Sequence, residues 1–257
     1  MTTPAKPQTD SSADRPHARW VRVSHWLTAA SVLTLAVSGF VILIAHPRLY
    51  WGEVGNDLVP ALIELPISPD FRPDAWVGHE PVTADPSGPI TANRTYEPYN
   101  QNGWARSLHF LAAWWLVLPG LIYLIAGLGG GHFRAHVWPR ARELGLRAFG
   151  REIADHLRLR IPKGTGGPRY GLLQKCAYSF VIFVATPLVL LTGVTMSPAV
   201  TASYPWLLDL FGGYQSARTI HFFTFLALVL FVLAHLAMVS LSGFSRQMRG
   251  MTIGDPR

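Results

Sequence analysis

Residues 219–241 have the sequence TIHFFTFLALVLFVLAHLAMVSL, which contains no Asp, Glu, Lys or Arg. A helix needs roughly 20 apolar residues to cross a bilayer, so this stretch is long enough to span a membrane. Its two histidines, His221 and His235, are 14 residues apart. At roughly 100° per residue the two imidazoles share one helix face, with about 21 Å between them along the axis. The stretch therefore predicts a membrane helix that carries two polar groups at two depths.

Three further stretches share this length and apolar character. The predicted spans are residues 23–45, 107–128, 172–195 and 219–241. Charged residues make up only 14% of the chain, against about 25% in an average soluble domain, so there is little charge to cover a water-facing surface. We therefore predict an all-α, integral membrane four-helix bundle. The single cysteine, Cys176, excludes a disulfide framework, a cysteine-ligated iron–sulfur cluster and a covalent CxxCH haem.

The basic residues predict the orientation of the spans. With the N-terminus in the cytoplasm, 17 Lys and Arg fall on the cytoplasmic side and five on the outer side, as the positive-inside rule requires. Both termini are then cytoplasmic, and we expect a multi-pass protein of the bacterial inner membrane. The topology accounts for the net charge of +7, so nucleic-acid binding is not expected.

The segments outside the spans complete the expected organisation. The parts are a disordered cytoplasmic tail at 1–19, a membrane domain at 20–250 and a short tail at 251–257. On the outer side, residues 46–106 form a long connection, and its acidic residues outnumber its basic ones. A loop of that length favours a functional or partner-contacting role. On the inner side, residues 129–171 contain a basic helix, from about 138 to 161, that we expect to lie on the anionic leaflet.

Four histidines lie inside the predicted spans, where ionisable residues are costly and are candidate functional groups. By depth they form two sets, His25 with His235 near the cytoplasmic side and His109 with His221 near the outer side. Two pairs at two levels suit two flat macrocycles, each ligated by two imidazoles. A zinc or copper site would need three or four ligands at one level. That site, and polar packing or a proton path, are the alternatives.

Three of these histidines follow an arginine by three residues. The arginines are Arg22, Arg106 and Arg218. Residues at i and i+3 share a helix face, so each guanidinium lies one turn nearer the membrane surface than its histidine. The propionates of a haem would emerge at that level, and the guanidinium group is the side chain best suited to bind a carboxylate. In the third span, Thr186-Pro187 and Thr192-Gly193 suggest a kink or close packing.

The chain resembles the four-helix dihaem cytochrome b family, which provides membrane subunits of formate dehydrogenases, nickel–iron hydrogenases and thiosulfate-reductase-type complexes and is cytochrome b561-like. The matching motifs are RVSHW at 22–26, ARSLH at 105–109, SARTIH at 216–221 followed by AH at 234–235, and RYGLLQK at 169–175. The resemblance implies two non-covalent, bis-histidine haem b groups. His25 and His235 would bind the inner haem, and His109 and His221 the outer one.

The same resemblance implies a quinone site near the inner haem. Its candidate residues are Tyr170, Gly171 and Gln174; family members often have Asn where this chain has Gly171. Interfacial anchoring is the alternative role for Tyr170. The implied function is electron transfer between the quinone pool and a periplasmic redox subunit such as a molybdoenzyme. The alternative is a stand-alone cytochrome b561-type enzyme, for example a superoxide:quinone oxidoreductase.

Overall fold

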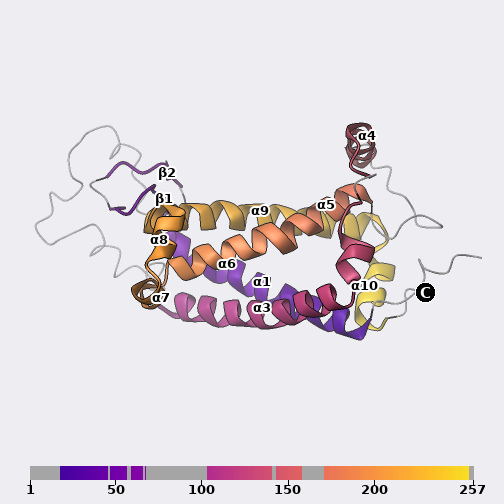
Figure 1. Cartoon of the computed structure of the whole chain (residues 1–257), viewed down its shortest axis with the longest axis horizontal. Coiled ribbons are helices and arrows are strands. Elements are labelled where there is room, and N and C mark those ends of the chain that lie inside the picture. Colours follow the sequence, from indigo (N-terminus) through magenta and orange to yellow (C-terminus); the bar gives the residue numbers. More distant parts are fainter. Residues whose placement is uncertain are drawn as a thin grey trace, which may run out of the picture. The chain divides into compact units, whose positions relative to one another are not determined.

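The computed structural model of the chain is almost entirely helical in the part that it describes (Figure 1). The described residues are 18–45, 47–56, 59–65, 67, 103–140, 143–157 and 171–254. Within these ranges the only sheet is a pair of two-residue strands. The protein is thus all-α, as the sequence predicts. The N-terminal tail through residue 17 and the greater part of the connection 46–106 lie outside the described residues.

Among the described residues, four helices are long and apolar enough to cross a membrane. They are α1 (Arg19–Ala45), α3 (Gly103–Gly129), the continuous helix Leu172–Thr195 and α9 (Tyr214–Leu241). They coincide with the four predicted spans, which confirms the predicted fold class. Three of them begin four or five residues earlier than predicted, because helical hydrogen bonding continues into polar turns that hydropathy does not mark.

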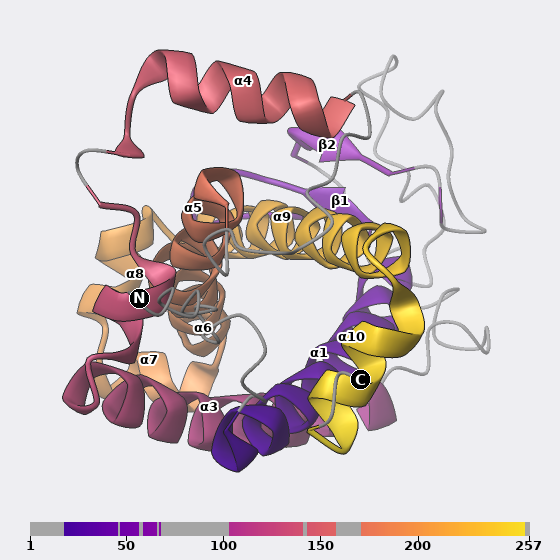
Figure 2. The ribbon, with the colours of Figure 1, turned by 90° about the vertical axis from the view of Figure 1, so that its right-hand side faces the viewer.

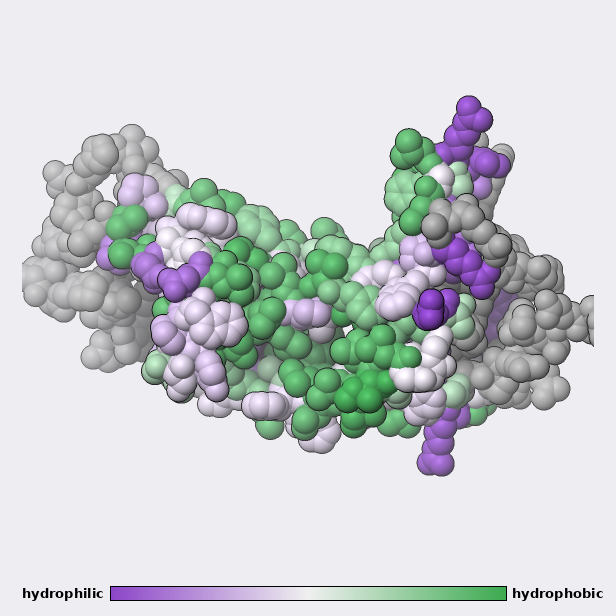
Figure 3. Space-filling model, viewed as in Figure 1, coloured by the Kyte–Doolittle hydropathy of each residue, from purple (hydrophilic) through white to green (hydrophobic). Residues whose placement is uncertain are grey.

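These helices expose large apolar side chains. Leu33 of α1 and Ile122 of α3 are each 67% exposed, and Leu230 of α9 is 59% exposed. Figure 3 shows such side chains as a mostly apolar surface over the spanning helices. Contiguous apolar surface of this kind is unfavourable in water, and lipid tails are its natural solvent.

The third span contains a wide turn. It consists of α5 (Leu172–Phe180), the π-helical turn η5 (Val181–Ala185) and α6 (Thr186–Thr195). Pro187 lacks a backbone N–H and cannot complete the regular hydrogen-bond ladder, so the turn before it is where the helix departs from α geometry. The sequence predicts an irregularity here, and the structure has one.

Contacts divide the chain into two compact units. The first unit consists of Met1–Trp26, Gly120–Ile182 and Phe231–Arg257, and the second of Leu27–Pro119 and Phe183–Leu230. In the first unit the C-terminal helix α10 (Phe244–Thr252) lies beside the beginning of α1 (Figure 2). Trp26 Nε1 donates a hydrogen bond to the carbonyl of Met251, at 3.0 Å.

The first unit also contains a helix in the inner connection, where the sequence predicts a basic one; this helix carries two arginines (Arg147 and Arg151) and two acids (Glu152 and Asp155). After the π-helical turn η3 (Phe133–Val137), this helix is α4 (Leu146–Leu157). It begins later than predicted, because Pro139 and Gly145 disfavour helix in its expected first half. Residues 158–161 lie outside the described residues.

In the second unit a segment that we call the strap (residues 47–56) is fastened to the start of α9. The carbonyl of Gly52 accepts the N–H groups of Gln215 and Ser216, at 2.9 and 3.2 Å. The Glu53 carboxylate accepts the N–H of Tyr214, at 3.3 Å. These contacts satisfy N–H groups that the first turn of a helix leaves unpaired.

A short strand in the strap pairs with a second short strand that follows it in the sequence. β1 (Arg48–Leu49) pairs antiparallel with β2 (Ile63–Glu64), so that Arg48 lies opposite Glu64. Arg48 Nε and Glu64 Oε1 form a 3.0 Å ion pair whose side chains are 8% and 5% exposed. The short helices α7 (Pro198–Ser203) and α8 (Trp206–Phe211) complete this unit. The sequence analysis predicts neither strand, because runs of two residues show no alternation.

Candidate functional site

The structure brings the four span histidines together as two pairs, one in each unit. In the first unit the ring centroids of His25 (α1) and His235 (α9) are 6.2 Å apart. In the second unit those of His109 (α3) and His221 (α9) are 6.3 Å apart. These are the pairs that the sequence predicts from depth, and their role as ligands stays a prediction.

The spacing within each pair fits two imidazoles on opposite sides of one metal ion. A ligating nitrogen lies about 2.0 Å from the metal and the ring centroid roughly 1.1 Å farther, so two such rings have centroids roughly 6.2 Å apart. The rings are too far apart for a direct hydrogen bond. Among the described residues, no group of three or more His, Cys, Asp or Glu is placed to hold a metal ion, which is what a zinc site would need.

Each histidine of the second pair has a hydroxyl partner on another helix. Ser38 Oγ lies 3.0 Å from His109 Nδ1, and Thr192 Oγ1 lies 3.1 Å from His221 Nδ1. Both hydroxyl side chains are fully buried. A second contact that orients the ring is typical of metal-binding histidines.

The first pair has different surroundings. His25 Nδ1 is buried and has no hydrogen-bond partner among the residues that the structure describes. The ring of Trp26 meets that of His25 edge-on, at 5.3 Å between centroids. On the other side, Phe231 stacks on His235 at 6.0 Å. The first pair is therefore packed against aromatic rings.

The arginine of the first unit is held by the C-terminal segment. Arg22 Nη1 donates to the carbonyl of Thr252, at 2.8 Å. Gly254 packs against the guanidinium, and a Cβ there would lie 2.7 Å from Nη1. Arg22 Nε is buried and without a partner within the described ranges. A buried donor of this kind, one turn from His25, fits a carboxylate such as a haem propionate.

The arginines of the second unit lie near one another. Arg218 is in electrostatic contact with Arg106 and with the phenols of Tyr50 and Tyr214. Two neighbouring guanidinium groups repel each other unless an anion lies between or beside them. Two cations beside the second histidine pair therefore fit the two propionates of a haem.

Comparison with known proteins identifies the family of the chain. The family described as prokaryotic cytochrome b561 matches residues 17–254. The chain belongs to this family. The cytochrome is also 30% identical, over 225 residues, to a protein of Azospira oryzae named putative protein-methionine-sulfoxide reductase subunit YedZ1. The alignment covers 88% of the cytochrome and 90% of that relative. No solved structure matches the chain.

Membership of the family establishes the general activity. The cytochrome is a prokaryotic multi-pass membrane protein that binds b-type haem and transfers electrons. The number of haem groups, the ligand of each iron and the redox partners belong to the proposal below. The predicted resemblance to four-helix, cytochrome b561-like proteins is thus confirmed at the level of the family.

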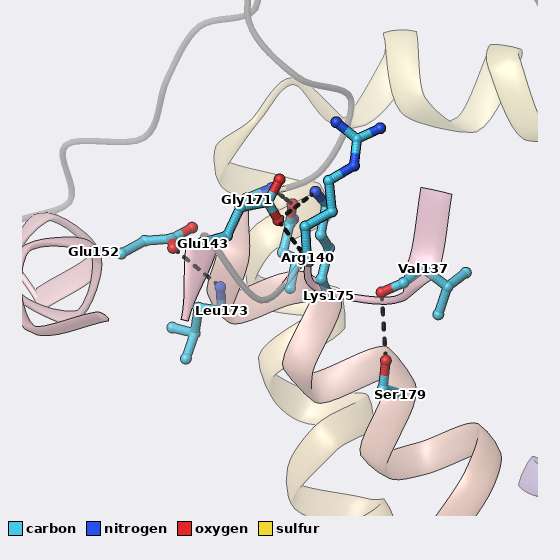
Figure 4. Close-up of polar contacts among 9 residues, drawn as sticks. Val137, Arg140, Glu143, Glu152, Gly171, Leu173, Lys175 and Ser179 are labelled. Atoms are coloured by element: carbon cyan, nitrogen blue, oxygen red, sulfur yellow. Dashed lines mark hydrogen bonds and ion pairs between the residues drawn. The ribbon is translucent and has the colours of Figure 1, made fainter. Parts of the chain in front are cut away.

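Two of the candidate quinone residues, Gly171 and Gln174, lie at the start of α5, and Figure 4 shows the surroundings of this turn. Gln174 Oε1 accepts the N–H of Gly171, at 3.3 Å, which leaves the amide NH2 of Gln174 as a donor. Glu152 of α4 accepts the N–H of Leu173, at 3.0 Å. A Cβ on Gly171 would collide with the Glu152 carboxylate. Tyr170 lies outside the described residues.

An ion pair beside these residues ties the inner connection to the third span. Lys175 Nζ and Glu143 Oε2 are 2.9 Å apart (Figure 4). The hydrogen bond from Lys175 holds the pKa of Glu143 below its usual value. Farther along α5, Ser179 Oγ donates to the carbonyl of Val137, at 3.3 Å. The connection is therefore fastened to α5 at several points.

Sequence reasoning missed the roles of Ser38 and Glu152. It marked Thr192-Gly193 for close packing, and the structure places that pair against His221. A signal for the other histidine contact was present, since Ser38-Gly39 is a second hydroxyl–glycine doublet within a span. Nothing in the local sequence indicates that Glu152 reaches the start of α5.

Proposed function

We propose that the cytochrome binds two haem b groups and passes electrons between the quinone pool and a soluble redox partner on the outer face of the membrane. His25 and His235 would hold one haem, and His109 and His221 the other. The observation that carries the proposal is the spacing of the ring centroids, 6.2 and 6.3 Å in two independent pairs. One pair at this spacing could arise from packing; two at nearly the same value favour a common ligand geometry.

The chain's own residues would set the properties of each site. When bound, haem b supplies a one-electron iron couple. The histidines would hold the iron through their ring nitrogens, Arg22 and the Arg106/Arg218 pair would neutralise propionates, and the apolar spans would exclude water. Low dielectric strengthens each of these electrostatic contacts. A protein that keeps its redox groups dry and fixed has little to reorganise when an electron moves.

The start of α5 would form the quinone site. Gln174 keeps two amide hydrogens that can donate to a quinone carbonyl, since its oxygen already accepts from Gly171. Tyr170, immediately before, would supply a phenol. By the positive-inside rule this end is cytoplasmic and the strap is periplasmic, so electrons cross the membrane between the two.

The partner would be a soluble reductase or dehydrogenase that docks on the outer side. The Azospira relative is named as a putative subunit of a protein-methionine-sulfoxide reductase, which supports a partner that reduces oxidised methionine. The acidic connection 46–106 would provide part of the docking surface.

The proposal is tested on the detergent-purified full chain by pyridine-haemochrome quantitation and by reduction with a quinol. We expect about two b haems per chain, both reduced by a quinol analogue and reoxidised by the soluble partner. A colourless protein would contradict the haem proposal. Two haems that dithionite reduces but no quinol reduces would contradict the quinone part alone.

Replacing Gly171 with alanine tests the quinone site. The new Cβ would displace the Glu152 carboxylate from the N–H of Leu173, and losing a hydrogen bond to a charged group costs about 1.5–3 kcal/mol. We expect the KM for a quinol analogue to rise several-fold while haem content stays the same. Gly150→Ala in α4, where a Cβ meets nothing within 4 Å, is the matched control. An unchanged KM in Gly171→Ala would argue against the site.

A further inference from the structure

Behind each histidine of the second pair lies a hydroxyl residue followed by a glycine. The doublets are Ser38-Gly39 of α1, against His109, and Thr192-Gly193 of α6, against His221. Both belong to the second unit. The same two-residue arrangement on two different helices indicates a shared role toward the two rings.

The direction of the hydrogen bond at His109 follows from the partners of Ser38. Ser38 Oγ lies 2.7 Å from the carbonyl oxygen of Thr34, which can only accept, so the single hydroxyl hydrogen is donated there. The Ser38 oxygen then accepts from His109 Nδ1, at 3.0 Å. The hydrogen of the neutral imidazole is therefore on Nδ1.

Thr192 of α6 has the same arrangement toward His221. Its Oγ1 donates to the carbonyl of Leu188, at 2.8 Å, and accepts from His221 Nδ1, at 3.1 Å. A hydrogen on Nδ1 leaves the lone pair on Nε2, which is the nitrogen that can bind a metal.

The glycines allow the close approach of the rings. A Cβ at Gly39 would lie 3.3 Å from His109 Cε1, and one at Gly193 would lie 3.4 Å from His221 Cε1. The first distance is shorter than an ordinary Cβ contact, and the second is at the short limit of ordinary van der Waals contact. The helix backbone therefore forms a flat wall behind each ring, and the hydroxyl fixes the rotation of the ring against that wall.

The first pair provides an internal comparison, because His25 Nδ1 has no such partner among the described residues. We propose that Ser38 and Thr192 are positioning residues: they hold His109 and His221 with Nε2 toward the iron and lower the reduction potential of that haem. The proposal rests on the proposed function. Hydrogen bonding to Nδ1 makes an imidazole a stronger donor to iron, and a stronger donor favours the oxidised state.

Redox titration of Ser38→Ala and Thr192→Val tests the proposal. If these hydroxyls only stabilised the fold, their loss would lower the thermal stability but would not change the reduction potential of a haem. We expect both haems to remain bound and one of the two transitions to shift to higher potential. Mutation of a residue that orients a metal ligand typically changes metal affinity or activity by about 10–100-fold, and we expect a change at the lower end of that range in the ratio of oxidised to reduced haem. A tenfold change in the ratio of oxidised to reduced haem corresponds to about 59 mV for one electron.

Two controls on the same helices match these variants. Ser31→Ala and Thr195→Val each remove a buried hydroxyl that donates to the carbonyl four residues earlier, at 2.8 Å, and has no histidine contact among the described residues. We expect their titrations to overlay that of the unaltered chain. Equal shifts in test and control variants, or no shift in Ser38→Ala and Thr192→Val with both haems bound, would overturn the inference.

Haem content of the unaltered chain separates the two proposals. If that chain holds no haem, the proposed function fails and the inference fails with it. If it holds two haems and the hydroxyl variants titrate as it does, the inference alone fails. Gly39→Ala adds a second measurement: the ring must move by a few tenths of an ångström, so we expect lower occupancy of one haem, whereas Gly120→Ala, with nothing within 4 Å of its Cβ, keeps both.

Discussion

Replacing His235 with alanine is expected to remove one of the two haems and to leave the other in place. The two histidine pairs lie in different units of the chain, so each of the two proposed haems would have its own pair of ligands. An iron that loses one of two strong axial ligands is no longer held in a bis-histidine site. Pyridine-haemochrome quantitation should therefore fall from about two haems per chain to about one.

The His109→Ala variant should lose the other haem, and the double variant should lose both. His132→Phe is the matched control, because His132 packs among Trp20 and Tyr123 and phenylalanine keeps an aromatic ring there. We expect that variant to retain both haems. If His109→Ala and His235→Ala each removed all haem, or if both removed the same haem, the two-pair assignment would be wrong.

Replacing Glu64 with alanine is expected to destabilise the strap strongly. The Arg48–Glu64 pair is almost fully buried, with 8% and 5% of the side chains exposed. Breaking a buried ion pair by removing one partner costs about 3–5 kcal/mol. Hydrogen exchange should then show faster exchange of the amide of Leu62, which donates to the Leu49 carbonyl at 2.7 Å.

The double variant Arg48→Met with Glu64→Leu separates lost charge from lost packing. Replacing both members of a buried ion pair by apolar residues is often neutral, since no charge remains unpaired. We expect the exchange rates of the double variant to lie near those of the unaltered chain. If the single and double variants exchanged equally fast, the destabilisation would come from lost packing of the two side chains and not from their charges.

The fold was largely predictable because a membrane span is determined by the length and the apolar content of one stretch of sequence. Length and apolar content alone located all four spanning helices, and the 3.6-residue period put His221 and His235 on one face. The expected depth of each histidine in the membrane then predicted both histidine pairs. None of these steps needs to know which helix packs against which, and for that reason they succeeded without a structure.

The contacts around the site could not be predicted in the same way. Glu152 reaches the N–H of Leu173 across 21 residues, and Ser38 reaches His109 across 71. Such contacts depend on the rotation of each helix about its axis, which hydropathy leaves free. The strap was also missed, because a buried ion pair and a carbonyl cap are tertiary features without a local pattern.

The single unbroken helix α9 carries one histidine of each pair. Inserting or deleting one residue between His221 and His235 would rotate one imidazole by about 100° relative to the other and move it by about 1.5 Å along the axis. Exchanges among apolar residues in this interval keep both rings in place. The stretch between the two histidines can therefore vary in composition but not in length. Adding or removing one residue would disturb the relative positions of His221 and His235 more than many apolar substitutions would.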